Sequence, residues 1–290
     1  MQGAGGLCYT VAHLHHRHAT RHPPTPALDM QTSRTDRRLT LHAHNSAGAP
    51  VWLFDLDNTL HAASSAIFPR INRLMTDYVE RIANTDRAGA DALRVEYTRR
   101  YGATLLGLLR HHAVDPHHFL HEVHVLGDLM ASVHTERSLA GILRALPGRK
   151  IILTNGPEAY ARGLLRALGI ERLFEQVIAI EQMQGGRAWR AKPDLNMLRQ
   201  VLRRASVNPT QAILVEDTRG HLKSYKRLGL RTVWMVGHLP EVRRANAQQI
   251  VRGTGRPHYV DYRIRSLKSL HRISPRRNPC GNPAQTKTRP

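Results

Sequence analysis

Short apolar runs recur along the middle of the chain, with amphipathic segments between them. The runs cover residues 51–54, 151–153, 177–180, 213–215 and 232–236 and are rich in β-branched residues. Runs of this length between turn-forming or polar residues are typical of strands that are buried on both faces. Two of the intervening segments carry apolar residues at helical spacing, namely Tyr160, Leu164, Leu165 and Leu168 before Gly169, and Leu195, Leu198, Val201 and Leu202. This alternation predicts an α/β fold with a Rossmann-like parallel sheet core flanked by helices.

Residues 64–134 break this alternation. They contain no strand-like run, but Ile71, Leu74, Met75 and Tyr78 form a helical stripe, and the helical signal continues over 97–109. We therefore predict a helical cap domain, residues 64–134, inserted after the first strand. The core is then made of residues 50–63 and 135–265.

The two ends of the chain lack a helical or strand period. Residues 1–49 mix His, Thr, Arg, Pro and Gly, and residues 266–290 combine Arg, Lys, Pro and Asn. Both segments are therefore predicted to be disordered tails, the second of them basic. The two cysteines, Cys8 and Cys280, lie in these tails, so the sequence offers neither a disulfide framework nor a cysteine metal site.

The chain is strongly basic, with 43 Lys and Arg against 22 Asp and Glu and a formal net charge of +21. Such a charge attracts a phosphate-bearing substrate or partner. The basic C-terminal tail has no aromatic residue that would stack on bases, so we do not expect specific nucleic-acid binding. The sequence shows no signal-peptide segment and no run of membrane-spanning length, which favours a cytoplasmic protein that does not enter membranes.

Residues that can carry chemistry follow the predicted strands. They are Asp55 and Asp57 after the first run, Thr154 and Asn155 after the second, Lys192 at the start of a later helix, and Glu216 and Asp217 after the fourth run. In an open parallel sheet, ligands bind just beyond the carboxyl ends of the strands. Mg²⁺ prefers carboxylate, carbonyl and water oxygens. Lys192 and the Thr154 hydroxyl would donate hydrogen bonds to a phosphoryl group.

The two aspartates after the first strand indicate a reaction. A carboxylate can attack phosphorus and form an aspartyl-phosphate, which divides one difficult displacement into two easier ones. Asp55 and Asp57 lie two residues apart, so they can reach one substrate from different angles. One can act as the nucleophile while the other handles the proton of the leaving oxygen. The sequence therefore predicts Mg²⁺-dependent hydrolysis of a small-molecule phosphate monoester.

The spaced residues of this edge resemble the four motifs of the haloacid-dehalogenase-like phosphatase superfamily over about residues 51–236. The matching positions are Asp55-x-Asp57-x-Thr59, Thr154, Lys192 and Glu216-Asp217. The resemblance implies that Asp55 is the nucleophile and that Asp57 is the general acid and then the general base. The superfamily's dehalogenases typically lack a second aspartate in the first motif, so Asp57 favours phosphoryl transfer.

The same resemblance implies a metal site and a phosphate site. Mg²⁺ would be held by the Asp55 carboxylate, the Asp57 main-chain carbonyl and Asp217, with Glu216 acting beside Asp217 directly or through water. The phosphoryl group would be bound by Thr154, Asn155 and Lys192.

A narrower similarity points to the pyrimidine 5′-nucleotidase branch of this superfamily. It is carried by Asp57-Asn58-Thr59-Leu60, by Leu153-Thr154-Asn155-Gly156-Pro157 and by Val215-Glu216-Asp217-Thr218. That branch has a helical cap after the first motif, and it implies pyrimidine nucleoside 5′-monophosphates as substrates. His221 departs from the branch, which usually has Asn there. Two alternatives stay open: a phosphatase for a sugar phosphate or other small metabolite, and a basic nucleic-acid-binding protein on a catalytically retired scaffold.

Other basic residues give weaker signals. His117, His121 and His124 have the helical spacing that a zinc site would use. Further histidines nearby, and no companion cysteine, favour a polar or substrate-facing cap surface instead. Arg190 precedes Lys192 closely and either assists phosphate binding or is simply exposed.

Overall fold

The computed structural model describes residues 49–127, 130, 133–186, 188–239 and 256–273. All of them belong to one compact unit that begins at His44. The predicted N-terminal tail, apart from residue 49, lies outside the described residues. No helix in the described part of the chain combines the length and the apolar character needed to cross a membrane.

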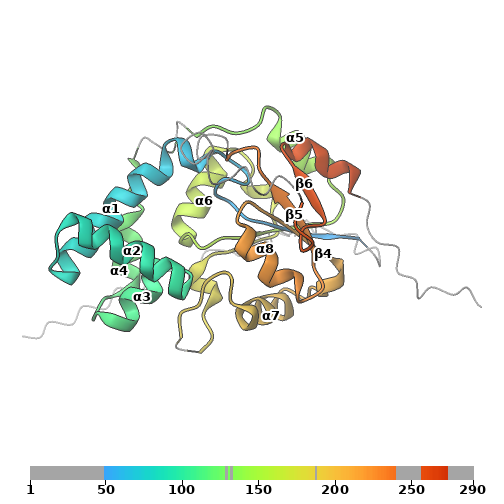
Figure 1. Ribbon diagram of the computed structural model, residues 1–290. Helices are drawn as coiled ribbons and strands as arrows, with labels where there is room; N and C mark the ends of the chain where they lie inside the picture. The colour runs from blue at the N-terminus through green and yellow to red at the C-terminus, as the bar shows by residue number, and fades with distance from the viewer. Residues whose placement is uncertain (1–48, 128–129, 131–132, 187, 240–255, 274–290) are drawn as a thin grey trace, which may run out of the picture. The chain divides into compact units, whose positions relative to one another are not determined.

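The core is a parallel sheet of six strands (Figure 1). The strands are β1 (Val51–Phe54), β2 (Arg149–Leu153), β3 (Gln176–Ile178), β4 (Ala212–Glu216), β5 (Arg231–Met235) and β6 (Tyr262–Ile264). Their order in the sheet is β3-β2-β1-β4-β5-β6, and every neighbouring pair is parallel. This confirms the predicted α/β class. Because β1 lies between β2 and β4, the residues that follow these three strands meet at one edge.

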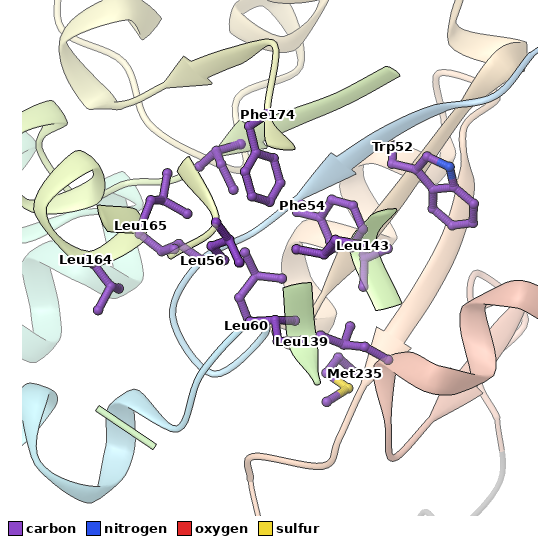
Figure 2. Packing of buried hydrophobic residues seen from close by; sticks show 14 of the residues in the cluster. Trp52, Phe54, Leu56, Leu60, Leu139, Leu143, Leu164, Leu165, Phe174 and Met235 are labelled. Carbon is purple, nitrogen blue, oxygen red and sulfur yellow. The ribbon is translucent and has the colours of Figure 1, made fainter. Parts of the chain in front are cut away.

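Two helical layers cover the sheet. The residues of β1 alternate between them, as the pleat of a strand requires. Trp52 and Phe54 pack in a cluster with α5 (Leu139–Ala145) and α6 (Glu158–Ala167). Figure 2 shows Phe54 in this cluster, where its ring meets Phe174 edge-on at 6.0 Å between centroids. Val51 and Leu53 point to the other face, against α7 (Leu195–Arg204) and α8 (Arg219–Lys226).

Between β1 and α5 the described chain forms α-helices and no strand. They are α1 (Ile67–Ala83), α2 (Arg87–Tyr101), α3 (Thr104–His111) and α4 (Pro116–Val123) (Figure 1). Their buried apolar side chains form a cluster that also includes Ile180 and Ala191. The expected helical stretch over 97–109 is two helices, because Gly102 between them has φ +93°. That left-handed conformation favours glycine. A Cβ at Gly102 would lie 3.0 Å from the Lys192 carbonyl oxygen, so glycine also permits close approach of the inserted helices to the core.

The last described segment differs from its prediction. Residues 266–290 were expected to form a disordered tail, but η7 (Leu267–Arg272) is a 3-10 helix that buries Leu267 and Leu270 in the core. The apolar residues recur every third position, so the basic residues between them stay exposed. Glu136 fixes the start of the helix, because its carboxylate accepts from Leu267 N at 2.7 Å and from Ser266 Oγ at 2.6 Å. Residues 274–290 lie outside the described part.

Two further details of the sheet were not predicted. Strand β6 was missed, because Tyr262 and Arg263 are exposed and only Ile264 is buried. The third strand ends at Ile178, and Ile180 begins a short 3-10 helix and packs with the inserted helices. The 3-10 helix that begins at Ile180 is η4 (Ile180–Met183), and the described residues also form the 3-10 helices η1 (Ala63–Ser65), η3 (Glu171–Leu173) and η5 (Pro209–Gln211).

Candidate active site

All the predicted site residues line one cavity of about 310 Å³: Asp55, Asp57, Thr154, Asn155, Lys192, Glu216 and Asp217. The cavity lies beyond the carboxyl ends of β1, β2 and β4, as the parallel pairing requires. The inserted helices contribute its apolar wall, which consists of Phe68, Ile71, Met75, Leu105, Phe119 and Leu120. The cavity therefore has a charged floor and an apolar wall.

Asp55 is buried at the end of β1. Its backbone N–H donates to Val215 O at 3.0 Å, which extends the pairing of β1 with β4 by one residue. One carboxylate oxygen, Oδ1, accepts from Lys192 Nζ at 2.6 Å, and Oδ2 accepts from Thr59 Oγ1 at 3.0 Å. Burial, followed by the charge of Glu216, raises the pKa of Asp55 to about 6. The hydrogen bonds from Lys192 and Thr59 hold the Asp55 carboxylate in one orientation.

Lys192 is a buried ammonium between two carboxylates. Its Nζ donates to Asp55 Oδ1 at 2.6 Å and to Glu216 Oε2 at 2.9 Å. Burial by itself lowers the pKa of Lys192, but the two carboxylates outweigh it and raise that pKa above its ordinary value. Burial likewise works to raise the pKa of Glu216, but the Lys192 charge and His221 outweigh it and lower that pKa. Both groups are therefore charged at neutral pH.

Asn155 supports Lys192 through the main chain. Its Oδ1 accepts from Lys192 N at 2.8 Å, and its Nδ2 donates to Lys192 O at 3.3 Å. Both ends of the amide are thus engaged by the backbone that presents the ammonium. The predicted contact of Asn155 with phosphate stays a prediction. The buried Thr154 hydroxyl accepts from Gly156 N at 3.0 Å, and its own hydrogen can be donated to a ligand.

Three carboxylates form a group with the spacing of metal ligands. Asp55, Glu216 and Asp217 each offer an oxygen, and these oxygens lie within 4.8 Å of one another. In the part of the chain that the structure describes, no other group of three His, Cys, Asp or Glu side chains is so placed. Burial and then the charges of Glu216 and Asp55 raise the pKa of Asp217 to about 9. A divalent cation would relieve this repulsion, so the oxygen ligands fit Mg²⁺.

Asp57 has a separate set of partners. Its Oδ1 accepts from the Tyr160 hydroxyl and lies 3.0 Å from His61 Nε2. Burial and the nearby Asp57 charge raise the pKa of Tyr160 well above its ordinary value, so the hydroxyl stays protonated and donates. The sequence interpretation missed both partners. Tyr160 was assigned to the apolar stripe of a helix, and His61 follows the first motif without any pattern of its own.

The remaining basic residues have other contacts. His221 Nδ1 lies 3.1 Å from Glu216 Oε2, so this histidine does approach the acidic group. His117 packs edge-on against Trp189, and the His124 ring lies 5.3 Å from the Tyr160 ring. The nitrogens of His117, His121 and His124 do not form a group with metal-ligand spacing. Arg190 donates to Asp194 Oδ2 at 2.7 Å.

An acidic site at the carboxyl edge of a parallel sheet is the arrangement of an α/β enzyme. The family model of the haloacid dehalogenase-like hydrolases matches residues 51–229, and the chain belongs to this family of hydrolases.

Two solved structures, with TM-scores of 0.50 or more, share this fold. The chain is similar to CbbY from Rhodobacter sphaeroides in complex with phosphate, with a TM-score of 0.52 and 20% identity over 77% of this chain and 96% of that one. It is also similar to a HAD phosphatase from Thermococcus onnurineus, with a TM-score of 0.50 and 20% identity over 77% and 96% of the two chains. The L-2-haloacid dehalogenase from Xanthobacter autotrophicus matches with a TM-score of 0.46 and 18% identity over 77% and 97%.

Proposed function

We propose that this protein is a Mg²⁺-dependent phosphatase that hydrolyses phosphate monoesters through an aspartyl-phosphate on Asp55. The observation that carries the proposal is the separation of two aspartates in one cavity. Asp55 is held by Lys192 and Thr59, and Asp57 is held by different donors, Tyr160 and His61. Two carboxylates with different partners can take the roles of nucleophile and of acid and base.

In the first step, an oxygen of Asp55 attacks phosphorus while the bond from phosphorus to the leaving oxygen breaks. Asp57 gives its proton to that leaving oxygen. In the second step, water attacks the aspartyl-phosphate, the bond between Asp55 and phosphorus breaks, and Asp57 takes a proton from the water. Lys192 and the Thr154 hydroxyl donate to the phosphoryl oxygens as charge develops on them.

Mg²⁺ would be held by the carboxylates of Asp55, Glu216 and Asp217 and by the main-chain carbonyl of Asp57. When bound, it supplies positive charge that offsets the negative charge of the carboxylates and the phosphoryl group.

The apolar wall supports a substrate class. A nucleobase has apolar faces that pack against side chains such as Phe68, Met75 and Phe119. A sugar phosphate presents several hydroxyl groups, for which the described residues of the inserted helices offer the side chains of Thr98, Thr104 and His124. We therefore favour nucleoside 5′-monophosphates over sugar phosphates, with α1 to α4 acting as a cap over the leaving group. The preference for a pyrimidine base rests on the resemblance of the motifs to the pyrimidine 5′-nucleotidase branch. A nucleic-acid-binding protein on a catalytically retired scaffold would not need the buried contacts of Lys192 with Asp55 and Glu216. These contacts therefore argue against that alternative.

A substrate panel tests the proposal. Purified protein with Mg²⁺ is incubated with nucleoside monophosphates and sugar phosphates, and inorganic phosphate is measured. We expect turnover with Mg²⁺, a preference for pyrimidine 5′-monophosphates, and loss of turnover with EDTA. Preference for a sugar phosphate would favour the second candidate.

The Asp55→Asn variant tests the mechanism. It should fold but release no phosphate and form no phospho-enzyme that mass spectrometry detects. Phosphate release retained in that variant would refute the role of Asp55.

A further inference from the structure

We infer that Tyr160 and His61 are positioning residues for Asp57: they hold one oxygen of its carboxylate so that the other faces the leaving oxygen of the substrate. The inference rests on the proposed phosphatase function. It adds two residues that the four motifs do not contain and assigns a separate role to each carboxylate oxygen of Asp57.

The geometry distinguishes the two oxygens. The Tyr160 hydroxyl and His61 Nε2 both contact Oδ1. A carboxylate oxygen only accepts, so His61 donates from Nε2 in the tautomer that carries its hydrogen there. Among the described residues, Oδ2 of Asp57 has no hydrogen-bond partner, and Asp57 lines the catalytic cavity. Oδ2 is therefore the oxygen that is available to a ligand.

Neither donor is free to move away. His61 is fully buried at the end of the tight turn that carries Asp57, and the two residues form an isolated bridge. Tyr160 lies in the first turn of α6 with its ring against Gly156, where a Cβ would come within 2.9 Å of the ring. The absence of a side chain at Gly156 thus lets the ring lie close to the main chain. The His124 ring, at the end of α4, packs 5.3 Å from the Tyr160 ring.

This arrangement has a chemical consequence. With Oδ1 occupied by two donors, the proton of the acid form is carried on Oδ2. That proton passes to the leaving oxygen when its bond to phosphorus breaks, and Oδ2 takes a proton from water in the second step. Loss of either donor lets the carboxylate rotate, which weakens proton transfer but leaves nucleophilic attack by Asp55 intact. The defect should therefore depend on how much help the leaving group needs.

Two aryl phosphates of nearly equal size test this point. p-Nitrophenolate leaves without protonation, whereas phenolate is a much poorer leaving group. For Tyr160→Phe, we expect kcat/KM to fall about 10- to 100-fold with phenyl phosphate and to change less than about threefold with p-nitrophenyl phosphate. Hydrolysis of the aspartyl-phosphate needs Asp57 as base, so we expect this intermediate to accumulate in Tyr160→Phe. Its accumulation would be seen as an initial burst of p-nitrophenolate.

Matched variants separate positioning from packing. Tyr225→Phe removes another buried hydroxyl, one without a hydrogen-bond partner in the described residues, and should leave both substrates unaffected. His61→Leu should reproduce the defect of Tyr160→Phe, and His61→Gln, which keeps a donor, should restore part of the activity. Equal losses on both substrates, or no loss on either, would overturn the inference. If wild-type protein hydrolyses neither aryl phosphate nor any nucleotide, the proposed function itself fails.

Discussion

Replacement of Lys192 by methionine removes the single cation that two buried carboxylates share. Methionine has a similar length and no charge, so the change leaves the packing nearly intact. Asp55 and Glu216 then lose their charged partner in a site from which water is largely excluded. We therefore expect Lys192→Met to lose much of its stability in the absence of metal. Lys192 would then stabilise the fold in addition to its proposed role in catalysis.

The contact distances set the magnitude. The ammonium lies 2.6 Å from Asp55 Oδ1 and 2.9 Å from Glu216 Oε2. With an effective dielectric constant of about 20, each contact contributes roughly 6 kcal/mol of Coulomb attraction. The cost of desolvating the ammonium, several kcal/mol, acts in the opposite direction. Removal of one partner from a buried pair costs about 3–5 kcal/mol, and the total stability of a protein is about 5–15 kcal/mol.

Guanidinium denaturation in EDTA at neutral pH, followed by circular dichroism, measures the free energy of unfolding. The matched control is Lys226→Met, because Lys226 Nζ contacts Asp261 at 2.5 Å but both side chains are partly exposed. That variant should lose less than about 1 kcal/mol. Mg²⁺ should restore part of the stability of Lys192→Met, because the cation can compensate the same carboxylates.

A loss below about 1 kcal/mol for Lys192→Met would refute this reasoning. It would mean that the carboxylates take up protons at little cost when the ammonium is gone. The charge on Lys192 would then contribute little to the free energy of unfolding. Asp55 and Glu216 would stay buried without a permanent cation beside them.

Three further variants test the site and its surroundings. Asp217→Asn should abolish the increase in thermal unfolding midpoint that Mg²⁺ gives the wild type, as differential scanning fluorimetry would show. Gly102→Ala should lose more activity than Gly169→Ala, because both glycines have positive φ but only the first would meet Lys192 O, whereas nothing lies within 4 Å of the second. Lys226 and main-chain contacts outweigh burial and hold the pKa of Asp261 below its ordinary value of 3.8. Its contribution is present above that pH and lost as pH falls through the lowered pKa, so urea unfolding of Asp261→Asn should match wild type only in acid.

The central strands could be predicted because burial on both faces leaves a continuous apolar run in the sequence. Residues 51–54 and 213–215 show this plainly, and both lie in the middle of the sheet. The edge strand β6 buries only Ile264, so its sequence carries no such run. The 3-10 helix after it was hidden by its basic residues, which are exposed between Leu267, Leu270 and Ile273. The basic composition indicated a disordered tail. The packing depends instead on the apolar residues at every third position.

The site shows the same division between what sequence can and cannot predict. Strand order brings Asp55, Thr154 and Asp217 together, so their proximity follows from a parallel sheet whose β1 lies between β2 and β4. Tyr160 is different, because its ring belongs to the apolar stripe of α6 while its hydroxyl reaches Asp57. The spacing of apolar residues predicts that the Tyr160 ring is buried. It does not predict which group the hydroxyl contacts.

Lys192 explains why the acidic site can be buried at all. One ammonium serves Asp55 and Glu216, and the third carboxylate, Asp217, is left without a cationic partner among the described residues. Burial, followed by the charges of Glu216 and Asp55, raises the pKa of Asp217 to about 9. A site in which every carboxylate had a cationic partner would attract a further cation less strongly. The incomplete compensation by Lys192 is therefore what prepares the three carboxylates to bind a metal, at a cost in stability that the rest of the fold must offset.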